Sequence, residues 1–177
     1  MKLVILDRDG VINVDSDQYI KSPEEWKPIA GSLEAIARFT QAGFRVVLAT
    51  NQSGLGRGLF DMATLNAMHN KMHKAVGQLG GRIDAVFFCP HAQDAGCACR
   101  KPQPGMLLEI AQRFNITLAD VPAIGDSLRD LQAASAAGAR PVLVLTGKGE
   151  KTLESGGLPE GTEIYKDLDA AALALAA

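Results

Sequence analysis

Short apolar segments alternate along this chain with longer segments that have the spacing of amphipathic helices. The apolar segments have the length of β-strands and lie at residues 2–6, 45–49, 85–88, 121–124 and 141–145, with a short sixth at 164–165. The helical segments lie at residues 33–41, 61–79, 104–114, 127–137 and 168–175, with Ser32 and Asp61 as expected N-caps. This alternation predicts an α/β fold in which a Rossmann-like parallel sheet carries helices on both faces. Residues 146–161 are rich in glycine and charge, and we expect a loop there.

The length and composition of the chain are those of one globular domain. The 177 residues are 47% hydrophobic and 21% charged, without a repeat or linker, so we expect a single domain over residues 1–177. A net charge of −2 argues against nucleic acid or an anionic membrane as a partner. No run of about 18 apolar residues is present to form a transmembrane helix. Because Met1-Lys2 leads directly into the first strand, we expect no signal peptide and a cytoplasmic location. We also expect a monomer.

Two carboxylates follow the first predicted strand in the motif Asp7-Arg8-Asp9-Gly10. Side chains alternate along an extended chain, so Asp7 and Asp9 are expected on the same side. One carboxylate could attack an electrophile while the other transfers a proton, and both could hold a divalent cation. A solvated acidic turn is the alternative, and the motif alone does not decide between the two.

Hydroxyl and amide groups follow the second predicted strand in the motif Thr50-Asn51-Gln52-Ser53. Such groups can bind phosphate oxygens without adding formal charge. They are also the groups that form caps and local turns. Arg57 lies between two glycines a few residues farther on, where it could reach a substrate phosphate or remain a solvated surface charge.

Two cations and a further carboxylate complete the candidate set. Arg100 and Lys101 precede a predicted helix. A lysine beside a carboxylate nucleophile would neutralise a transferring phosphoryl group, and an arginine offers a bidentate fork for substrate oxygens. Asp126 follows the fourth strand, where it could cap a helix or bind Mg²⁺, and Asp130 one turn on could support it or lie on the surface. The carboxyl ends of parallel strands meet at one edge, so we expect the three motifs that follow strand ends, Asp7-Arg8-Asp9, Thr50-Asn51-Gln52-Ser53 and Gly125-Asp126, in one crevice.

In this order and spacing, the four motifs resemble those of the haloacid dehalogenase superfamily of phosphotransferases. The resemblance covers most of the chain. It implies a nucleophile at Asp7, a general acid and base at Asp9, and phosphoryl contacts from Thr50 and Lys101. It also implies catalytic Mg²⁺ held by Asp7, by the backbone carbonyl of Asp9 and by Asp126.

All three cysteines lie close together and enclose a histidine, in the order Cys89, His91, Cys97 and Cys99. This set matches a tetrahedral Cys₃His zinc site. Because four protein ligands fill the coordination shell, the predicted zinc is structural and braces the loop that carries Arg100 and Lys101. The alternative is a group of unliganded cysteines around a core strand.

The cysteine loop makes the resemblance narrower. Together with the other motifs it looks like the branch of the superfamily that removes the 7-phosphate of D-glycero-D-manno-heptose 1,7-bisphosphate for lipopolysaccharide core synthesis. That branch lacks a large cap domain, and the intervals between the motifs leave no room for one here. The segment after Gly10 resembles the substrate-contacting flap of that branch. The residues expected to bind the phosphosugar are Asp15, Gln18, Tyr19, Asn51, Gln52, Ser53, Arg57 and Arg100.

Two other functions stay open at this point. Histidinol-phosphate phosphatases share nearly every motif, including the zinc ligands. A non-catalytic module that binds phosphorylated metabolites is the alternative from another class, although intact Asp7, Asp9, Lys101 and Asp126 argue against it. His69 and His73 lie four residues apart on a predicted helix, and we expect a structural or exposed pair because Asn70 stands where a zinc protease motif needs glutamate.

Overall fold

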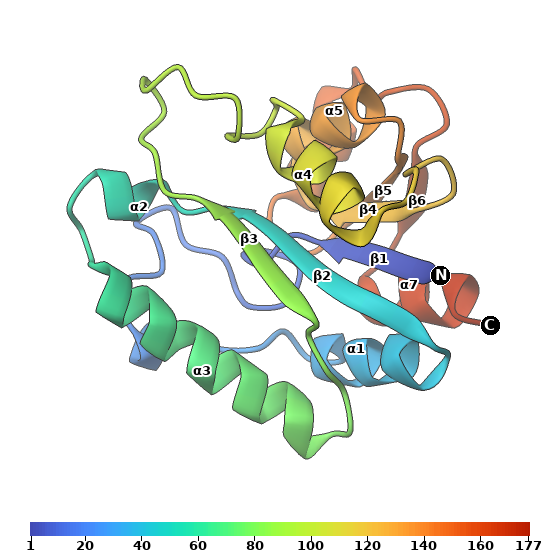
Figure 1. Cartoon of the computed structure of the whole chain (residues 1–177), viewed down its shortest axis with the longest axis horizontal. Coiled ribbons are helices and arrows are strands. Elements are labelled where there is room, and N and C mark those ends of the chain that lie inside the picture. The colour runs from blue at the N-terminus through green and yellow to red at the C-terminus, as the bar shows by residue number, and fades with distance from the viewer.

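The computed structural model describes all 177 residues and contains one parallel six-stranded sheet with the order β3-β2-β1-β4-β5-β6 (Figure 1). The strands are β1 (Lys2–Leu6), β2 (Phe44–Asn51), β3 (Ala85–Cys89), β4 (Pro122–Gly125), β5 (Arg140–Val144) and β6 (Glu163–Tyr165). Every predicted strand is present, with small displacements at the ends. The predicted α/β fold is confirmed.

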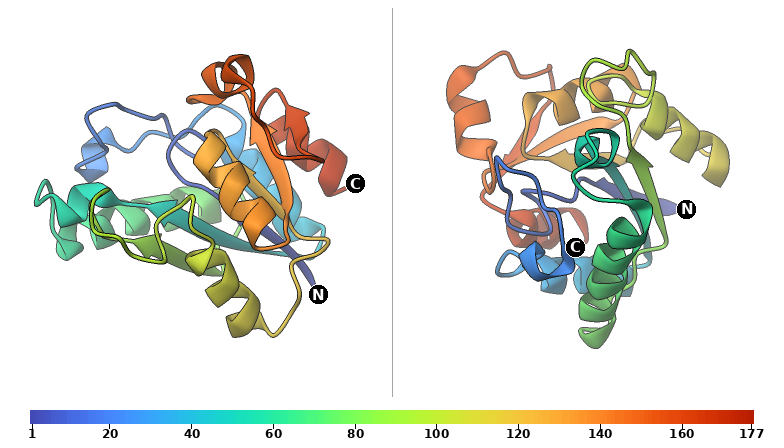
Figure 2. Two further views of the ribbon diagram at one scale, coloured as in Figure 1. Left: turned by 90° about the horizontal axis from the view of Figure 1, so that it is seen from above. Right: turned by 90° about the vertical axis from the view of Figure 1, so that its left-hand side faces the viewer.

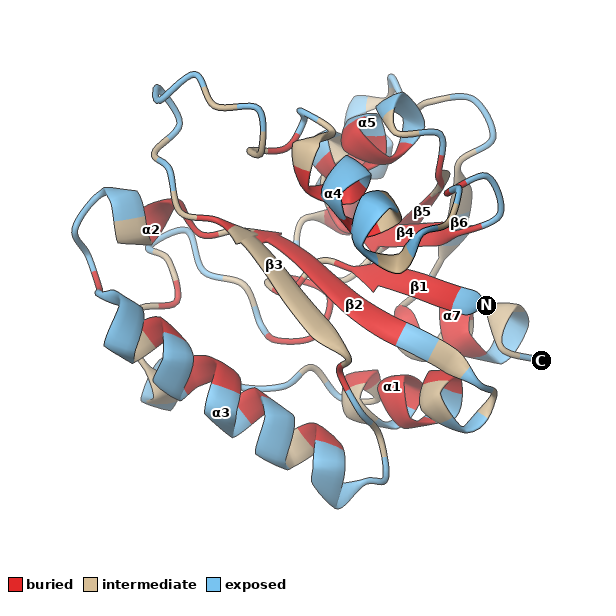
Figure 3. Ribbon diagram, in the orientation of Figure 1, coloured by how far each residue is buried: buried red, intermediate tan, exposed pale blue.

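Helices cover both faces of the sheet (Figures 1 and 3). On one face lie α1 (Ser32–Gln41), α3 (Met62–Gln78) and α7 (Leu168–Leu175), and on the other lie α4 (Gly105–Phe114) and α5 (Leu128–Ala136). Alternation along β1 supplies both cores, because Val4 and Leu6 join the first layer while Leu3 and Ile5 join the second. Each such fully buried side chain contributes about 1.5–3 kcal/mol of transfer free energy. The sheet is therefore a rigid platform for the loops at its edge.

The strand order reverses beside β1, whose neighbours are β2 and β4. Chain connections leave in opposite directions at this point, which opens a crevice at the carboxyl ends of the strands. The backbone N–H of Asp7 donates to the carbonyl of Ile124 over 2.9 Å. This bond fixes the first residue after β1 against β4, where the crevice is expected.

Two loops, residues 7–31 and 90–104, lie over the carboxyl ends of the strands (Figure 2, right). The first contains one short 3₁₀ turn, η1 (Pro23–Glu25), and the short helix α2 (Ser53–Gly56) follows β2 beside them. The predicted absence of a large cap domain is confirmed. No helix combines the length and apolar character that crossing a bilayer requires.

Two local predictions are wrong. The segment predicted as a loop contains α6 (Gly149–Ser155), which is tied to the sheet by the Thr152 hydroxyl donating to the carbonyl of Asp126 over 2.8 Å. The local sequence is rich in glycine and does not reveal this tertiary hydrogen bond, so it did not predict the helix. Ser32 does not cap α1: Gly31 precedes the helix with a left-handed φ of 87°, and the Ser32 hydroxyl donates instead to the carbonyl of Val11.

Candidate active site

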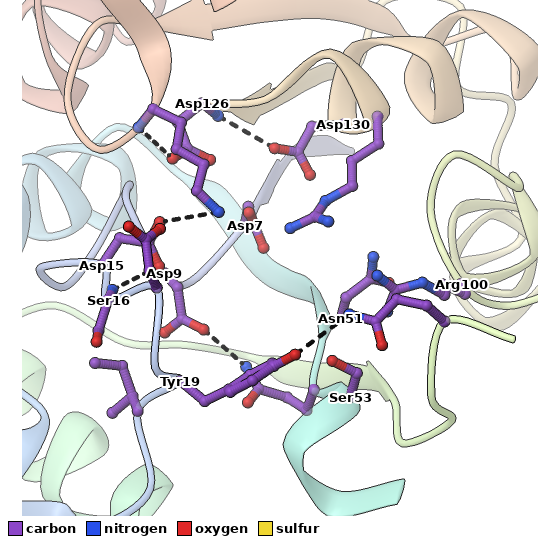
Figure 4. Close-up of a pocket in the computed structure, with 16 residues that line it drawn as sticks. Asp7, Asp9, Asp15, Ser16, Tyr19, Asn51, Ser53, Arg100, Asp126 and Asp130 are labelled. Carbon is purple, nitrogen blue, oxygen red and sulfur yellow. Dashed lines mark hydrogen bonds and ion pairs between the residues drawn. The ribbon is translucent and has the colours of Figure 1, made fainter. Parts of the chain in front are cut away.

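A polar pocket of about 150 Å³ opens in the crevice at the carboxyl ends of the strands (Figure 4). Six of the residues that line it carry carboxylates, namely Asp7, Asp9, Asp15, Asp17, Asp126 and Asp130. Only Arg100, Arg129 and Lys148 in the lining are cationic. With carboxylates in the majority, an anionic ligand needs an added cation to enter favourably.

Three carboxylates converge at one side of the pocket (Figure 4). Oxygens of Asp7, Asp126 and Asp130 lie within 4.8 Å of one another. Burial and the negative charge of Asp130 raise the pKa of Asp7 to about 7, against the opposing pull of Lys101. Burial together with the charges of Asp130 and Asp7 raises the pKa of Asp126 to about 8. A divalent cation would relieve this repulsion, so the arrangement fits the predicted Mg²⁺ site.

Asp130 is held by protein donors. One of its oxygens accepts from the Lys101 ammonium over 3.0 Å. The other accepts from the backbone N–H groups of Asp126 and Ser127 and from the Ser127 hydroxyl, which completes a capping box at the start of α5. Burial opposes ionisation of Asp130, but Lys101 and Ser127 outweigh it and hold the pKa of Asp130 below its usual value. Asp130 is thus a support for Lys101 and Asp126, and its oxygens have little capacity left for a metal.

Lys101 is buried beneath the pocket, with its ammonium 3.5 Å from Asp7 and also bonded to the carbonyl of Ala49. Burial favours the neutral amine, but the carboxylates of Asp130 and Asp7 raise the pKa of Lys101. Its backbone is clamped by Asn51, which accepts from the Lys101 N–H over 3.0 Å and donates to the Lys101 carbonyl. The end of β2 thereby sets the position of the cation beside Asp7.

Glycine is required where the chain passes Asp126. A side chain at Gly10, whose φ is 85°, or at Gly147 would overlap a carboxylate oxygen of Asp126. The same oxygen accepts from the backbone N–H of Lys148 over 2.9 Å. The loops after β1 and β5 therefore enclose Asp126 from two sides and fix its orientation toward Asp7.

Asp9 is bound on both oxygens. Arg8 and Asn13 each donate to Oδ1 over 2.9 Å, and the Gln52 amide donates to Oδ2 over 3.3 Å. The Gln52 amide also donates to the Thr50 hydroxyl over 2.9 Å. No hydrogen bond from the protein ends on the backbone carbonyl of Asp9, which leaves it available as the predicted metal ligand.

The structure brings most, but not all, of the predicted substrate contacts to the pocket. Asn51, Gln52, Ser53, Asp15, Tyr19 and Arg100 line it. Thr50 and Lys101 are buried next to lining residues: the Thr50 hydroxyl accepts from Gln52, and the Lys101 ammonium lies 3.5 Å from Asp7. Gln18 and Arg57 do not line it. Gln18 is exposed on the flap, and Arg57 bonds Gln93 and lies 5.8 Å from the centre of the Tyr19 ring.

The flap is attached at both sides of the pocket. Asp15 pairs with the Lys148 ammonium over 3.5 Å, and the Gln93 amide of the cysteine loop donates to the Tyr19 hydroxyl over 3.3 Å. Tyr19 has a left-handed φ of 66° and lines the pocket. The segment after Gly10 and the cysteine loop therefore both border the pocket.

Sequence reasoning did not select Arg129 or Lys148. Arg129 lies in the first turn of α5, just after the motif that carries Asp126, and this position could have identified it. Lys148 lies in the segment taken for a featureless loop, and no sequence signal places it beside Asp15. His69 is buried and contacts Arg8, while His73 is exposed, in line with the predicted structural or exposed pair.

The three cysteines and His91 form a second cluster, with one ligand atom from each within 4.8 Å of the others. Cys89 Sγ lies 3.4 Å from His91 Nδ1 and 3.5 Å from Cys97 Sγ. Burial, with the neighbouring thiols, raises the pKa of Cys89 to about 12, so a cation is needed to hold its thiolate. The donor set and this electrostatic demand fit a tetrahedral zinc site with no open position.

The sheet order, the paired aspartates after β1, the hydroxyl after β2, the lysine before α4 and the aspartate after β4 together define a phosphotransferase of the haloacid dehalogenase class. The family model for HAD-hydrolase-like proteins matches residues 98–171, and the model for the polynucleotide kinase 3 phosphatase matches residues 2–128.

Proteins of known activity with similar sequences identify the family within this class. A D-glycero-β-D-manno-heptose-1,7-bisphosphate 7-phosphatase of Bordetella bronchiseptica is 66% identical over 172 residues, which cover 97% of this chain and 96% of the relative. Its counterpart in Pseudomonas aeruginosa is 54% identical over 98% of this chain and 97% of the relative. The chain belongs to the family of these heptose bisphosphate phosphatases.

Solved structures of heptose bisphosphate phosphatases have the same fold as this chain. The D,D-heptose 1,7-bisphosphate phosphatase of B. bronchiseptica, complexed with magnesium and phosphate, has a TM-score of 0.98 and covers 99% of this chain and 98% of its own. The enzyme from Burkholderia thailandensis is 61% identical, with a TM-score of 0.80 over 98% of this chain and 97% of its own.

Proposed function

We propose that this chain is a Mg²⁺-dependent phosphatase that removes the 7-phosphate of D-glycero-D-manno-heptose 1,7-bisphosphate through an aspartyl-phosphate on Asp7. The observation that carries the proposal is the buried group of Asp7, Asp126 and Lys101 at the floor of the pocket. The identity to named heptose bisphosphate phosphatases supplies the substrate.

In the first step a carboxylate oxygen of Asp7 forms a bond to the 7-phosphorus as the bond from phosphorus to the sugar oxygen breaks. Lys101, 3.5 Å from Asp7, offsets charge on the phosphoryl oxygens together with the Thr50 hydroxyl. Bound Mg²⁺ would supply Lewis-acid polarisation of those oxygens, held by Asp7, the Asp9 carbonyl and Asp126.

Asp9 handles the protons in both steps. It gives a proton to the departing sugar alkoxide, and then takes a proton from the water that attacks the phosphorus. The bond from phosphorus to Asp7 breaks, which releases inorganic phosphate and returns Asp7 as a carboxylate. Each group is thus restored after one turnover.

The second phosphate of the substrate needs cations of its own. Arg100 and Arg129 both line the pocket, neither forms an ion pair with a carboxylate, and Nη1 of Arg100 is buried without a hydrogen-bond partner. Two free guanidinium groups suit a phosphate, for which arginine offers parallel N–H donors. The same pair disfavours histidinol phosphate, whose remote end carries an ammonium group.

The comparison of substrates tests this proposal. We expect kcat/KM for heptose 1,7-bisphosphate to exceed that for histidinol phosphate and for a 3′-phosphorylated oligonucleotide by about 100-fold or more, as two lost charge-assisted contacts imply. Phosphorus NMR should show that the sugar product keeps its 1-phosphate. Equal or faster hydrolysis of histidinol phosphate would refute the assignment, and binding of the sugar without any phosphate release would favour the non-catalytic module.

We also infer that the chain acts as a monomer in the cytoplasm. One copy supplies every group that the mechanism uses, and a reducing compartment keeps the cysteines available to zinc. Light scattering of the purified protein tests the first point, and a mass of two chains would contradict it.

A further inference from the structure

A buried network lies behind Asp9. The Arg8 side chain is fully buried, and its single carboxylate partner is Asp9, whose Oδ1 lies 2.9 Å from both Nε and Nη2 of Arg8. A buried guanidinium is costly unless its N–H groups are paired. Two neutral acceptors complete the pairing: Nη1 lies 3.2 Å from His69 Nε2, and Nη2 donates to Gln52 Oε1 over 3.3 Å.

His69 reaches this network from α3 and is itself buried. Burial and the positive charge of Arg8 lower the pKa of His69 to about 4, so its ring is neutral near neutral pH. Because the guanidinium has no acceptor, Nε2 must be the unprotonated nitrogen, and the ring proton is on Nδ1. A histidine in this state acts only as a fixed acceptor for Arg8.

Arg8 also decides which way the Gln52 amide points. Besides its 2.9 Å contact with Asp9 Oδ1, Nη2 donates to Gln52 Oε1, so the amide nitrogen of Gln52 faces Asp9 Oδ2 and the Thr50 hydroxyl. Oδ1 of Asp9 already accepts two donors at 2.9 Å, from Arg8 and Asn13. Oδ2 accepts a single longer one and is therefore the oxygen with capacity to carry a proton.

We propose that His69, acting through Arg8 and Gln52, is a positioning residue that aims the Asp9 carboxyl at the leaving group. This inference rests on the proposed function, in which Asp9 is the general acid. Without His69, Nη1 of Arg8 has no buried acceptor. The guanidinium then turns to find one, which draws Nε from Oδ1 and releases the carboxyl to rotate.

The test is the dependence of kcat/KM on the leaving group in His69→Leu. This parameter covers the steps up to release of the alcohol, so it includes proton donation by Asp9 but not hydrolysis of the phosphoenzyme. We expect a loss of about tenfold or more for the sugar bisphosphate and for alkyl phosphates. For p-nitrophenyl phosphate, whose phenolate leaves without a proton, we expect less than about a twofold change.

Two matched variants complete the experiment. His69→Gln keeps a neutral acceptor and should recover most of the loss, while His73→Leu, on the exposed side of the same helix, should match the wild type. If His69→Leu does not fold, Arg8→Lys keeps the charge without the fork and should show the same dependence on the leaving group.

Equal losses across all leaving groups would assign His69 to the fold alone and overturn the proposal. Wild-type rates in a folded His69→Leu variant would overturn it as well. Wild-type protein that ignores heptose bisphosphate but hydrolyses aryl phosphates would refute the proposed substrate, while the aryl and alkyl series would still decide the role of His69.

Discussion

At the scale of single residues, the main feature is the electrostatic cost of placing the carboxylates of Asp7 and Asp126 close together in the crevice. Their raised pKa values, about 7 and about 8, mean that the folded chain without metal retains protons that the unfolded chain has lost. For a carboxyl whose pKa is raised by folding, the stabilising contribution is complete below the unfolded pKa, about 4, and is lost as the pH rises through the folded value.

The raised pKa values predict how stability and Mg²⁺ affinity depend on pH. The contribution of Asp7 and Asp126 to the free energy of unfolding of the metal-free protein should fall as the pH rises from about 4 to about 8, because the two carboxylates become charged and repel each other. Mg²⁺ competes with their protons, so its affinity should be at least about tenfold higher near pH 8 than near pH 6. Calorimetry in buffers of different ionisation enthalpy should detect proton release near pH 6. An affinity independent of pH would contradict the charge balance described for the site.

At the scale of secondary-structure elements, the cysteine loop leads directly into Lys101, whose backbone Asn51 holds at the end of β2. Cys97 and Cys99 lie directly before Arg100 and Lys101, and the loop returns the chain to α4. Burial opposes ionisation of Cys97, but hydrogen bonds from the backbone of Arg100 and from Cys89 lower the pKa of the Cys97 thiol to about 6. The Cys97 thiol is therefore easily ionised and suited to bind a metal. Because Cys97 lies just before Arg100 and Lys101, loss of the metal could change activity by moving these two cations, although the metal does not contact the substrate.

We therefore predict that Cys97→Ser lowers zinc content and stability. Structural zinc contributes about 10–16 kcal/mol to folding in zinc-finger peptides. Loss of even about 3 kcal/mol would lower Tm by roughly 6–12 °C in a domain of this size. Elemental analysis and calorimetry measure both, with Asp94→Asn, an exposed change in the same loop, as the control. Native protein prepared without chelator and free of zinc would contradict the assignment.

The arrangement of strands, helices and loops also distinguishes the features that could be predicted from the sequence from those that could not. Strand and helix periodicity, with the strand-end motifs, was enough to predict the sheet and the meeting of Asp7, Thr50 and Asp126, because the carboxyl ends of parallel strands lie at one edge. The approach of Lys101 to Asp7 was expected only from the resemblance to the superfamily. The clamp between Asn51 and Lys101, the placement of Lys148 beside Asp15 and the existence of α6 depend on contacts between distant segments. No local pattern records such contacts.

At the scale of the whole molecule, the active site is an open crevice bordered by two loops. An open site cannot surround a small substrate, so selectivity must come from a few polar contacts. Arg100 lies across the pocket from Asp15 (Figure 4), and we propose that it binds the phosphate that is not transferred.

We predict that Arg100→Ala lowers kcat/KM for heptose 1,7-bisphosphate by roughly 10- to 100-fold, the value of a charge-assisted contact. The loss for an aryl monophosphate should stay below about threefold, since that substrate has no second phosphate. Arg113→Ala, an exposed arginine on α4, serves as the control for charge. Equal losses on both substrates would place Arg100 at the transferring phosphoryl group or in the stability of the loop.

The most direct test of the account is to trap the phosphoenzyme. Wild-type protein mixed with Mg²⁺ and heptose 1,7-bisphosphate, then quenched with acid within a turnover, should give a peptide phosphorylated at Asp7 by mass spectrometry. Asp7→Asn should fold normally, give no phosphopeptide and lose roughly six orders of magnitude in kcat, the size of the loss when the nucleophile of a serine protease is removed. Phosphorylation at another residue, or substantial turnover by Asp7→Asn, would contradict the central claim.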